Sequence, residues 1–234
     1  MDSPKIIYQD GEVLVLDKPS GWVTNDSSTT LNQNTIQTWI RTNHKSLITN
    51  HLEFRDGVVH RLDKETSGIL VVAKTVEAFT NLQKQFKERK VEKEYMALVH
   101  GKPRETGVGK IDAPVGRLPW RRDRFGVLLG GREAVTYFKI IKVISHKSEA
   151  YSLLQLQPKT GRTHQIRIHL KHIGHPIVGD EFYAGRKTAK NDRTWCPRLF
   201  LHAVKIKFLH PKTFNQVEFE SPLPDDLTDI LKSI

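Results

Sequence analysis

Residues 58–73 constrain the fold of this 234-residue chain more than any other stretch. Two apolar ends, Val58-Val59 and Ile69 to Ala73, flank a polar segment, and both ends are too short to be helices. We therefore expect two buried strands, with the polar segment in a loop at the edge of a sheet. Asp63 lies in that loop between the cations Arg61 and Lys64, which favour an ionised carboxylate. A carboxylate of this kind, placed where a rigid scaffold meets solvent, is suited to act as a nucleophile.

The polar segment also has a distinctive order of residues. His60 to Gly68 reads His-Arg-Leu-Asp-Lys-Glu-Thr-Ser-Gly and resembles the catalytic segment of the RluA-type RNA pseudouridine synthases. The resemblance implies that Asp63 is the essential catalytic residue. From its position two residues earlier, Arg61 is expected to fill the place of a flipped-out base or to hold a phosphate. The protein-kinase catalytic loop also begins with His-Arg, but its aspartate follows directly, whereas Leu62 intervenes here. A turn aspartate bridged to a neighbouring cation is the remaining alternative.

Three further segments match landmarks of the same family in the same order. Residues 18–21 read Lys-Pro-Ser-Gly, like a family segment that lines the active-site cleft. Residues 93–97 read Lys-Glu-Tyr-Met-Ala, like a family strand whose tyrosine stacks on the target base. The resemblance implies this role for Tyr95, although a strand tyrosine taken alone usually belongs to the core.

The third segment, residues 158–180, contains Thr-Gly-Arg-Thr-His-Gln-Ile-Arg-Ile-His-Leu followed by Gly-His-Pro-Ile-Val-Gly-Asp. The resemblance implies that its Arg167 is the arginine that pairs with the catalytic aspartate. Arg162 and His164 of the same segment are expected to contact the substrate.

A basic loop is expected at residues 117–125, where four arginines oppose one aspartate and two aromatic residues are interleaved. Guanidinium groups bind phosphate, and arginine and aromatic side chains both stack on unpaired bases. The loop resembles the family's hairpin that grips RNA, although Leu118 stands where relatives often have histidine. A solvated basic loop without a partner is the alternative. The expected substrate-binding residues are Arg117, Arg121, Arg122 and Arg124.

Histidines cluster after residue 163, at His164, His169, His172 and His175. Only His169 and His172 are spaced to share a helix face, and no carboxylate is close before Asp180. We therefore expect capping and packing roles and no metal site. In the polar stretch 43–55, His44 and His51 are expected at the surface.

The overall charge favours a polyanionic partner. The chain has 37 lysines and arginines against 26 aspartates and glutamates, which gives a formal net charge of +11. Its one cysteine, Cys196, excludes an internal disulfide framework and a multi-cysteine zinc site. The sequence has no signal-peptide pattern and no membrane-length apolar run. We therefore expect a cytoplasmic protein.

Apolar periodicity predicts the elements around these segments. Helices are expected to begin at caps formed by Thr35, Thr75 and Thr163. Strands are expected at 6–8 and 13–16, which form a hairpin, and at 92–99, 135–144, 151–156, 204–208 and 217–220. The resemblance implies a mixed α/β (α+β) fold: a bent, mainly antiparallel sheet with flanking helices and a central basic active-site cleft. Residues 1–234 are expected to form a single catalytic domain, without a separate N-terminal RNA-binding domain.

The resemblance of these segments to the family implies an RNA pseudouridine synthase that acts on ribosomal RNA, transfer RNA or both. The reaction breaks the bond between ribose and ring nitrogen 1 of uracil, turns the base and rejoins it through carbon 5, without a cofactor. The residues leave open whether Asp63 attacks the nucleotide or removes a ribose proton. The expected partner is an RNA stem-loop, because a base leaves its stack most cheaply in a loop. A monomer is the simplest assembly, and a non-catalytic RNA-binding or folding-assistance module is the alternative function.

Overall fold

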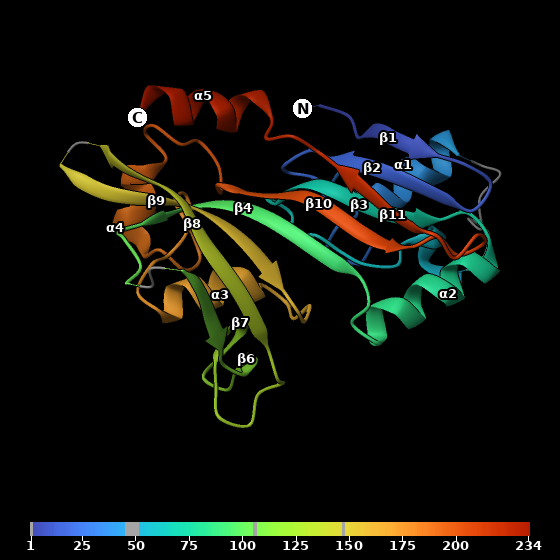
Figure 1. The fold of residues 1–234 in the computed structure, drawn as a ribbon, viewed down its shortest axis with the longest axis horizontal. Helices are drawn as coiled ribbons and strands as arrows, with labels where there is room; N and C mark the ends of the chain where they lie inside the picture. The colour runs from blue at the N-terminus through green and yellow to red at the C-terminus, as the bar shows by residue number, and fades with distance from the viewer. Residues whose placement is uncertain (1, 45–51, 105–106, 147) are drawn as a thin grey trace. The chain divides into compact units, whose positions relative to one another are not determined.

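The computed structural model describes residues 2–44, 52–104, 107–146 and 148–234 (Figure 1). The side chains of Leu52, Arg122 and Asp123 also lie outside the described part. The chain divides into two compact units, each formed by two segments. Unit 1 comprises Met1–Glu92 and Ala203–Pro222, and unit 2 comprises Lys93–His202 and Leu223–Ile234.

Unit 1 is built on a sheet with the strand order β1-β2-β3-β10, and β11 pairs with β10. The β1-β2, β2-β3 and β10-β11 pairs are antiparallel. The strands are β1 (Lys5–Gln9), β2 (Val13–Lys18), β3 (Ser67–Ala73), β10 (Leu201–Leu209) and β11 (Gln216–Glu220). The helical elements are α1 (Ile36–Asn43), the short 3-10 turn η1 (Leu52–Gly57) and α2 (Val76–Lys87).

The core of unit 1 lies between this sheet and α2. Strand β3 is buried along its whole length, and α2 contributes Phe79 and Leu82 to the same cluster. Helix α2 begins where it does because the Thr75 hydroxyl accepts a hydrogen bond from the N–H of Ala78. Near the start of β3, Gly68 has φ +109, and a Cβ there would lie 2.2 Å from a carbonyl oxygen of β10. Only glycine permits this close approach, which fixes the strand end that follows the Asp63 loop.

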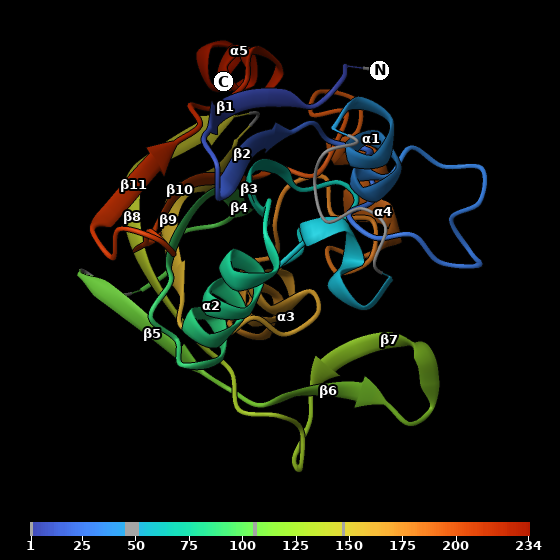
Figure 2. The ribbon, with the colours of Figure 1, turned by 90° about the vertical axis from the view of Figure 1, so that its right-hand side faces the viewer.

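Unit 2 has a sheet with the strand order β4-β9-β8-β5, in which every neighbouring pair is antiparallel. A two-stranded hairpin, β6-β7, stands away from this sheet (Figures 1 and 2). The strands are β4 (Glu92–His100), β5 (Val108–Asp112), β6 (Val115–Leu118), β7 (Arg121–Val127), β8 (Val135–His146) and β9 (Glu149–Pro158). The helices are α3 (Gln165–His172), α4 (Arg186–Asp192) and α5 (Asp225–Ser233). The arginine-rich segment 117–125 is therefore part of a β-hairpin.

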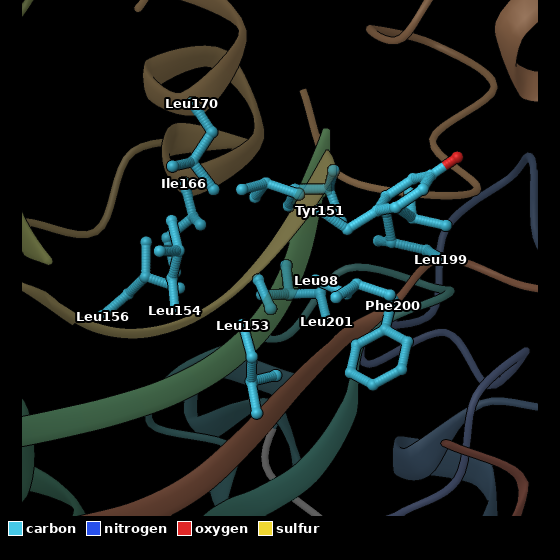
Figure 3. Close-up of a cluster of buried hydrophobic side chains, with 14 of the residues drawn as sticks. Leu98, Tyr151, Leu153, Leu154, Leu156, Ile166, Leu170, Leu199, Phe200 and Leu201 are labelled. Carbon is cyan, nitrogen blue, oxygen red and sulfur yellow. The ribbon is translucent and has the colours of Figure 1, made fainter. Parts of the chain in front are cut away.

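The main core cluster of unit 2 joins β4 and β9 to α3 and to the chain before β10 (Figure 3). Leu98 and Leu154 are fully buried in the sheet, and Ile166 and Leu170 of α3 reach the same cluster. Full burial of one such side chain contributes about 1.5–3 kcal/mol. Because α3 also carries Arg167, this packing fixes the helix that presents the guanidinium group.

Most of the expected elements are confirmed. The first hairpin, the later strands and the helices that follow Thr35 and Thr75 all form, and Thr35 and Thr75 accept the expected capping bonds. The expectation of a mixed fold with a mainly antiparallel sheet and flanking helices is confirmed as well. Among the described residues, no helix combines the length and the apolar character needed to cross a bilayer.

Two local expectations were wrong. Val58-Val59 is not a strand, because Val58 forms only an isolated bridge to Val72. Thr163 does not cap α3: His164 precedes the helix with a left-handed φ of 55, and it makes no side-chain capping bond. Instead, the side-chain oxygen of Gln165 accepts the N–H of Arg162 and closes the turn from inside the helix.

The two histidines expected at the surface have different outcomes. His44 is partly buried, and its ring centroid lies 5.1 Å from that of Trp39. Its position is therefore less exposed than expected. His51 lies outside the described residues.

Candidate functional site

Asp63 lies in the loop between η1 and β3, as the sequence predicts. Leu62 and Thr66 on either side are buried, whereas Asp63 is partly exposed and Arg61 is exposed. The N–H of Thr66 donates to the carbonyl oxygen of Asp63 at 3.1 Å, which closes the chain into a turn. The aspartate is therefore carried on a short turn with buried anchors.

Lys18, at the end of β2, fixes the main chain just after Asp63. The Lys18 side chain is fully buried. Its ammonium donates to the carbonyl oxygens of Pro19 at 3.0 Å, Trp22 at 2.8 Å and Lys64 at 3.2 Å. An ammonium has three N–H donors, and these three acceptors reduce the cost of burying its charge.

Two hydroxyl groups hold the same loop from the segment after Lys18. The hydroxyl of Thr24 donates to the carbonyl of Leu62 at 2.8 Å and accepts the N–H of the same residue at 3.2 Å. The hydroxyl of Ser20 donates to the carbonyl of Glu65 at 2.8 Å. Main-chain groups before and after Asp63 are therefore both bonded, which restricts the direction of its side chain.

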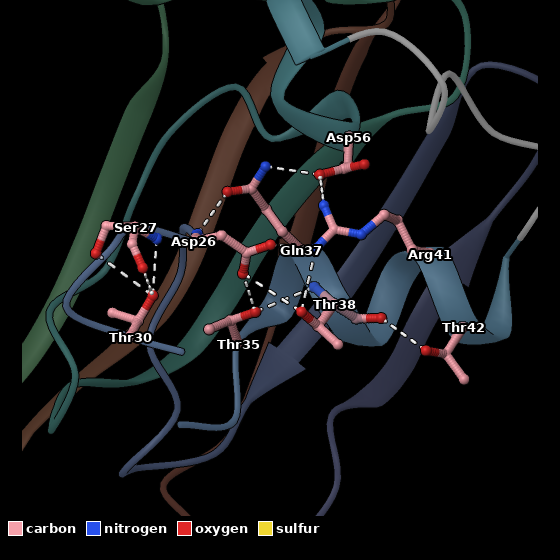
Figure 4. Close-up of polar contacts among 9 residues, drawn as sticks. All are labelled: Asp26, Ser27, Thr30, Thr35, Gln37, Thr38, Arg41, Thr42 and Asp56. Atoms are coloured by element: carbon pink, nitrogen blue, oxygen red, sulfur yellow. Dashed lines mark hydrogen bonds and ion pairs between the residues drawn. The ribbon is translucent and has the colours of Figure 1, made fainter. Parts of the chain in front are cut away.

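A polar cluster ties together the two chain segments that approach this loop (Figure 4). Arg41 of α1 pairs with Asp26 and with Asp56. Gln37 joins the same two residues, since its oxygen accepts the Asp26 N–H and its nitrogen donates to Asp56, both at 2.7 Å. Burial raises the pKa of Asp56, and its bonds to Gln37 and Arg41 oppose that rise. Helix α1 thus links Asp26 to Asp56, which precedes the Asp63 loop in the chain.

In unit 2, Arg167 lies in the first turn of α3 and is only 4% exposed. Its Nε and one Nη donate to the two carboxylate oxygens of Asp180, both at 2.8 Å. The rings of Phe182 and Tyr183 lie 5.5 and 5.1 Å from its Cζ atom. A two-point ion pair and two aromatic faces together fix the plane of the guanidinium group.

Arg162 and His164 lie in the turn before α3. The Nε of Arg162 donates to the carbonyl of Glu133 at 3.0 Å. The Nδ1 of His164 lies 2.9 Å from the hydroxyl of Tyr183. Both side chains therefore help to hold the turn from which Arg167 emerges.

Tyr95 lies in β4 opposite Leu156 of β9. It is partly buried and packs against the main core cluster of unit 2. Alternation along the strand places Lys93 on the same face. Burial, together with the nearby charge of Lys159, lowers the pKa of Lys93 to about 8. This face of β4 therefore carries a phenol and a partly desolvated amine two residues apart.

The arginines of the β6-β7 hairpin have different surroundings. The Cζ of Arg117 lies 5.1 Å from the ring centre of Phe125. Arg124 donates to the carbonyl of Phe182 at 2.9 Å, and its Cζ lies 5.6 Å from that ring. Both guanidinium groups thus contact aromatic residues of their own unit.

The tip of the hairpin is the most exposed part of the basic segment. Arg121 is exposed, and Trp120 beside it is 72% exposed. The side chain of Arg122 lies outside the described part. An exposed indole beside an exposed guanidinium is the combination that unpaired bases and phosphates favour.

The clustered histidines bond to protein groups. The Nδ1 of His169 lies 2.9 Å from the hydroxyl of Thr136, and its Nε2 lies 2.9 Å from the carbonyl of Ala113. Burial lowers the pKa of His169. The Nδ1 of His175 lies 2.8 Å from the carbonyl of His100. Within the described ranges, no three histidine, cysteine or acidic side chains gather in a way that could hold a metal ion.

Comparison with known proteins identifies the family. A family model described as RNA pseudouridylate synthase matches residues 12–172 of this chain. The chain belongs to this family. The matched range includes the Asp63 loop, the strand of Tyr95 and the helix of Arg167.

Individual relatives match most of the chain. A ribosomal large subunit pseudouridine synthase D from Nitrosomonas europaea is 39% identical over 98% of the chain and 65% of its own length. An uncharacterized RNA pseudouridine synthase from Chloroflexus aurantiacus is 44% identical over 78% of the chain and 54% of its own length. The chain thus spans between about half and two thirds of the length of these two relatives.

Solved structures agree on the fold. Human RNA pseudouridylate synthase domain containing 1 has a TM-score of 0.77 at 26% identity, covering 97% of this chain and 87% of that one. Human RNA pseudouridylate synthase domain containing 4 has a TM-score of 0.73 at 23% identity, which supports the fold alone.

Three residues that support Asp63 and Arg167 were not assigned a role from the sequence. Asp180 holds the guanidinium of Arg167, and Lys18 and Thr24 hold the Asp63 loop. Each lies in or beside a segment that matches a family landmark, so its position carried a signal. The sequence gives no signal for the group to which each one bonds, because tertiary packing decides which distant residues meet.

Proposed function

We propose that this chain is an RNA pseudouridine synthase that isomerises specific uridines in ribosomal or transfer RNA, with Asp63 as the essential catalytic residue. The observation that carries the proposal is the anchored turn of Asp63 in a chain of this family. Buried donors bond to the main chain before and after the carboxylate. Such anchoring fixes a reacting group in place before substrate arrives, which is a major source of rate enhancement.

In this proposal Asp63 either attacks the nucleotide or removes a proton from the ribose. Arg167 keeps Asp63 ionised and oriented. The pair with Asp180 supports this role, since it leaves the guanidinium with a fixed plane and no need to reorganise during the reaction. Tyr95 stacks on the target base and assists proton transfer at carbon 5.

RNA binding is assigned to arginines and one histidine. Arg61 takes the place left by the flipped-out base or holds a phosphate, and its exposure supports this role. The hairpin grips the RNA strand, supported by the exposed Arg121 and Trp120 at its tip. Arg117, Arg122, Arg124, Arg162 and His164 complete the proposed contacts.

We further propose that the two units form one catalytic domain that works as a monomer in the cytoplasm, without a cofactor or metal. Relatives named for the ribosomal large subunit favour ribosomal RNA as the substrate. Transfer RNA stays a candidate, and an RNA stem-loop is the proposed target in either case.

Release of tritium from carbon 5 tests the activity directly. When carbon 5 bonds to the sugar, it loses its hydrogen, so transcripts made with [5-³H]uridine release tritium into water as pseudouridine forms. We expect release from large-subunit ribosomal RNA or from transfer RNA, and the pattern names the substrate class. Fragments carrying single stem-loops then locate the uridine.

The alternative function, an RNA-binding module without catalysis, predicts a different result. It predicts binding of the same transcripts with no release of tritium by the intact protein. Such a result with both RNA classes would overturn the enzymatic proposal.

A further inference from the structure

Unit 1 contains a groove that the proposed chemistry does not use. It lies between α2 and η1 and has a volume of about 500 Å³. Phe54, Val59, Phe79 and Phe86 form its apolar lining, and Lys84 and Lys87 contribute the basic part. A volume of this size falls in the range of pockets that bind small organic groups.

The apolar part of the groove is aromatic. The rings of Phe54 and Phe79 meet edge to face, with centroids 5.3 Å apart and planes at 76°. Phe86 stacks on His60 with centroids 4.8 Å apart and planes at 26°. Phe54 and Phe86 are only partly buried. They therefore present ring surface to an occupant, and ring surface binds nucleobases without regard to their identity.

The basic part lies along one face of α2. Lys84 and Lys87 are exposed and three residues apart, which places them on one side of the helix in its last turn. The nearby carboxylate of Glu88 is already paired with Lys90 at 2.7 Å. The groove thus joins aromatic surface to positive charge, which complements a ligand that has both a ring and an anionic group.

The groove is also connected to the proposed catalytic loop. Val59 lines it, and the next residue, His60, stacks on Phe86 while its Nε2 accepts the N–H of Val71 at 2.9 Å. Val59 and Asp63 are four positions apart in the chain, so their Cα atoms are at most about 14 Å apart. The lining of the groove and the proposed catalytic residue therefore belong to one short segment of the chain.

We propose that this groove binds an unpaired nucleotide of the substrate RNA, beside the target uridine in the strand. The base packs against Phe54 and Phe86, and the phosphate lies against Lys84 and Lys87. This assignment rests on the proposed function, because RNA is the source of the nucleotide.

Binding of a labelled oligonucleotide tests the proposed contact between the phosphate and the two lysines. The probe is fluorescein-labelled dodecauridylate, and anisotropy gives its Kd over a range of salt. The double variant Lys84→Gln with Lys87→Gln should weaken binding about threefold to tenfold and reduce the salt slope by about 0.7 for one lost phosphate contact. The control is Lys5→Gln with Lys212→Gln, which removes the same charge from exposed lysines elsewhere in unit 1. Equal effects in the two double variants would overturn the proposal.

The proposed packing of the base against the phenylalanines is tested with a second pair of variants. Phe54→Leu should weaken binding of dodecauridylate about fivefold or more and leave an abasic dodecamer unaffected. Phe214→Leu, at a phenylalanine that is 65% exposed in unit 1, is the matched control. Equal loss with both probes would show that Phe54 acts through folding and not through a base, which would also overturn the assignment.

The outcome can be separated from that of the proposed function. If the protein releases tritium from RNA and the groove variants bind like their controls, the groove proposal alone fails. If the groove variants lose binding and no RNA releases tritium, the groove stands as an RNA site and the catalytic proposal fails.

Discussion

Two residues of opposite charge are central to the proposed reaction, and the molecule holds them in different ways. In unit 1, the side chain of Asp63 is partly exposed, and buried groups of Lys18 and Thr24 bond to the main-chain carbonyls of the residues on either side of it. In unit 2, the side chain of Arg167 is itself buried and held by the carboxylate of Asp180. The loop of Asp63 is thus held through main-chain groups of the neighbouring residues Leu62 and Lys64. The guanidinium of Arg167, held through its own atoms, gains a fixed orientation. Its ion pair with Asp180 therefore also contributes to the folding stability of unit 2.

The strongest test of this difference is Asp180→Asn. Removing one partner of a buried ion pair is strongly destabilising and costs about 3–5 kcal/mol. We expect urea unfolding to show a loss of that size, whereas Asp229→Asn, at an exposed pair with Lys232, should change stability by less than about 1 kcal/mol. Equal effects of the two variants would contradict the account of unit 2.

Lys18→Met tests how the Asp63 loop of unit 1 is held. It removes the buried ammonium from three carbonyl oxygens, of which that of Lys64 also accepts a main-chain N–H, from Gly21 at 2.8 Å. We expect a loss of about 1–3 kcal/mol of stability. The larger effect should be on catalysis: kcat for tritium release should fall at least about tenfold with KM within about twofold, since the turn of Asp63 is released while RNA contacts remain. Lys5→Met, at an exposed position in β1, is the control. A rise in KM with unchanged kcat would place Lys18 in RNA binding.

Lys93→Met examines the face of β4 that carries Tyr95. Burial lowers the pKa of Lys93 to about 8 in the folded protein, from a usual value of 10.5. Between these two values the unfolded chain holds a proton that the folded protein has lost, so this residue makes stability rise with pH, by at most about 1.4 kcal/mol per unit.

The methionine variant should therefore be more stable than the parent at pH 7, and its advantage should shrink as the pH rises from 8 toward 10. Thermal unfolding at a series of pH values measures the difference. An advantage that does not change with pH would mean that Lys93 is not desolvated.

The smallest expected effect on folding concerns the hairpin. Arg121→Gln removes an exposed charge, so stability should stay within about 0.5 kcal/mol. Binding of dodecauridylate should weaken about twofold to fivefold, and the salt slope should fall by about 0.7. Arg186→Gln, exposed in α4 of the same unit, is the control. A slope equal to that of the control would remove the hairpin tip from the RNA interface.

The sequence predicts the fold well where a local signal is strong. Thr35 and Thr75 cap helices as expected, because each hydroxyl can accept an N–H of the first turn while it donates to a nearby carboxylate, that of Asp26 or Glu12. The loop position of Asp63 follows from the polar segment between apolar ends. Val58-Val59 is buried like a strand without pairing as one, since burial and not ladder formation is what an apolar pair indicates.

The support around the candidate site could be predicted only in part. Lys18 and Asp180 lie in landmark segments, but nothing in the sequence indicates that one binds carbonyls near Asp63 or that the other binds Arg167. Likewise, Thr163 has the chemistry of a cap, yet the side chain of Gln165 takes over the turn before α3 because it also reaches Thr136 of β8. These contacts depend on segments that only the folded chain brings together.

The most direct test of the central claim is carbodiimide mapping of pseudouridine in total RNA from three strains. One strain has the intact gene, one lacks it, and one carries Asp63→Asn. We predict that defined uridines are modified only with the intact gene, while purified Asp63→Asn protein binds RNA within a few fold of the parent. Full modification in the Asp63→Asn strain at the positions lost on deletion would contradict the assignment of Asp63 as the essential catalytic residue.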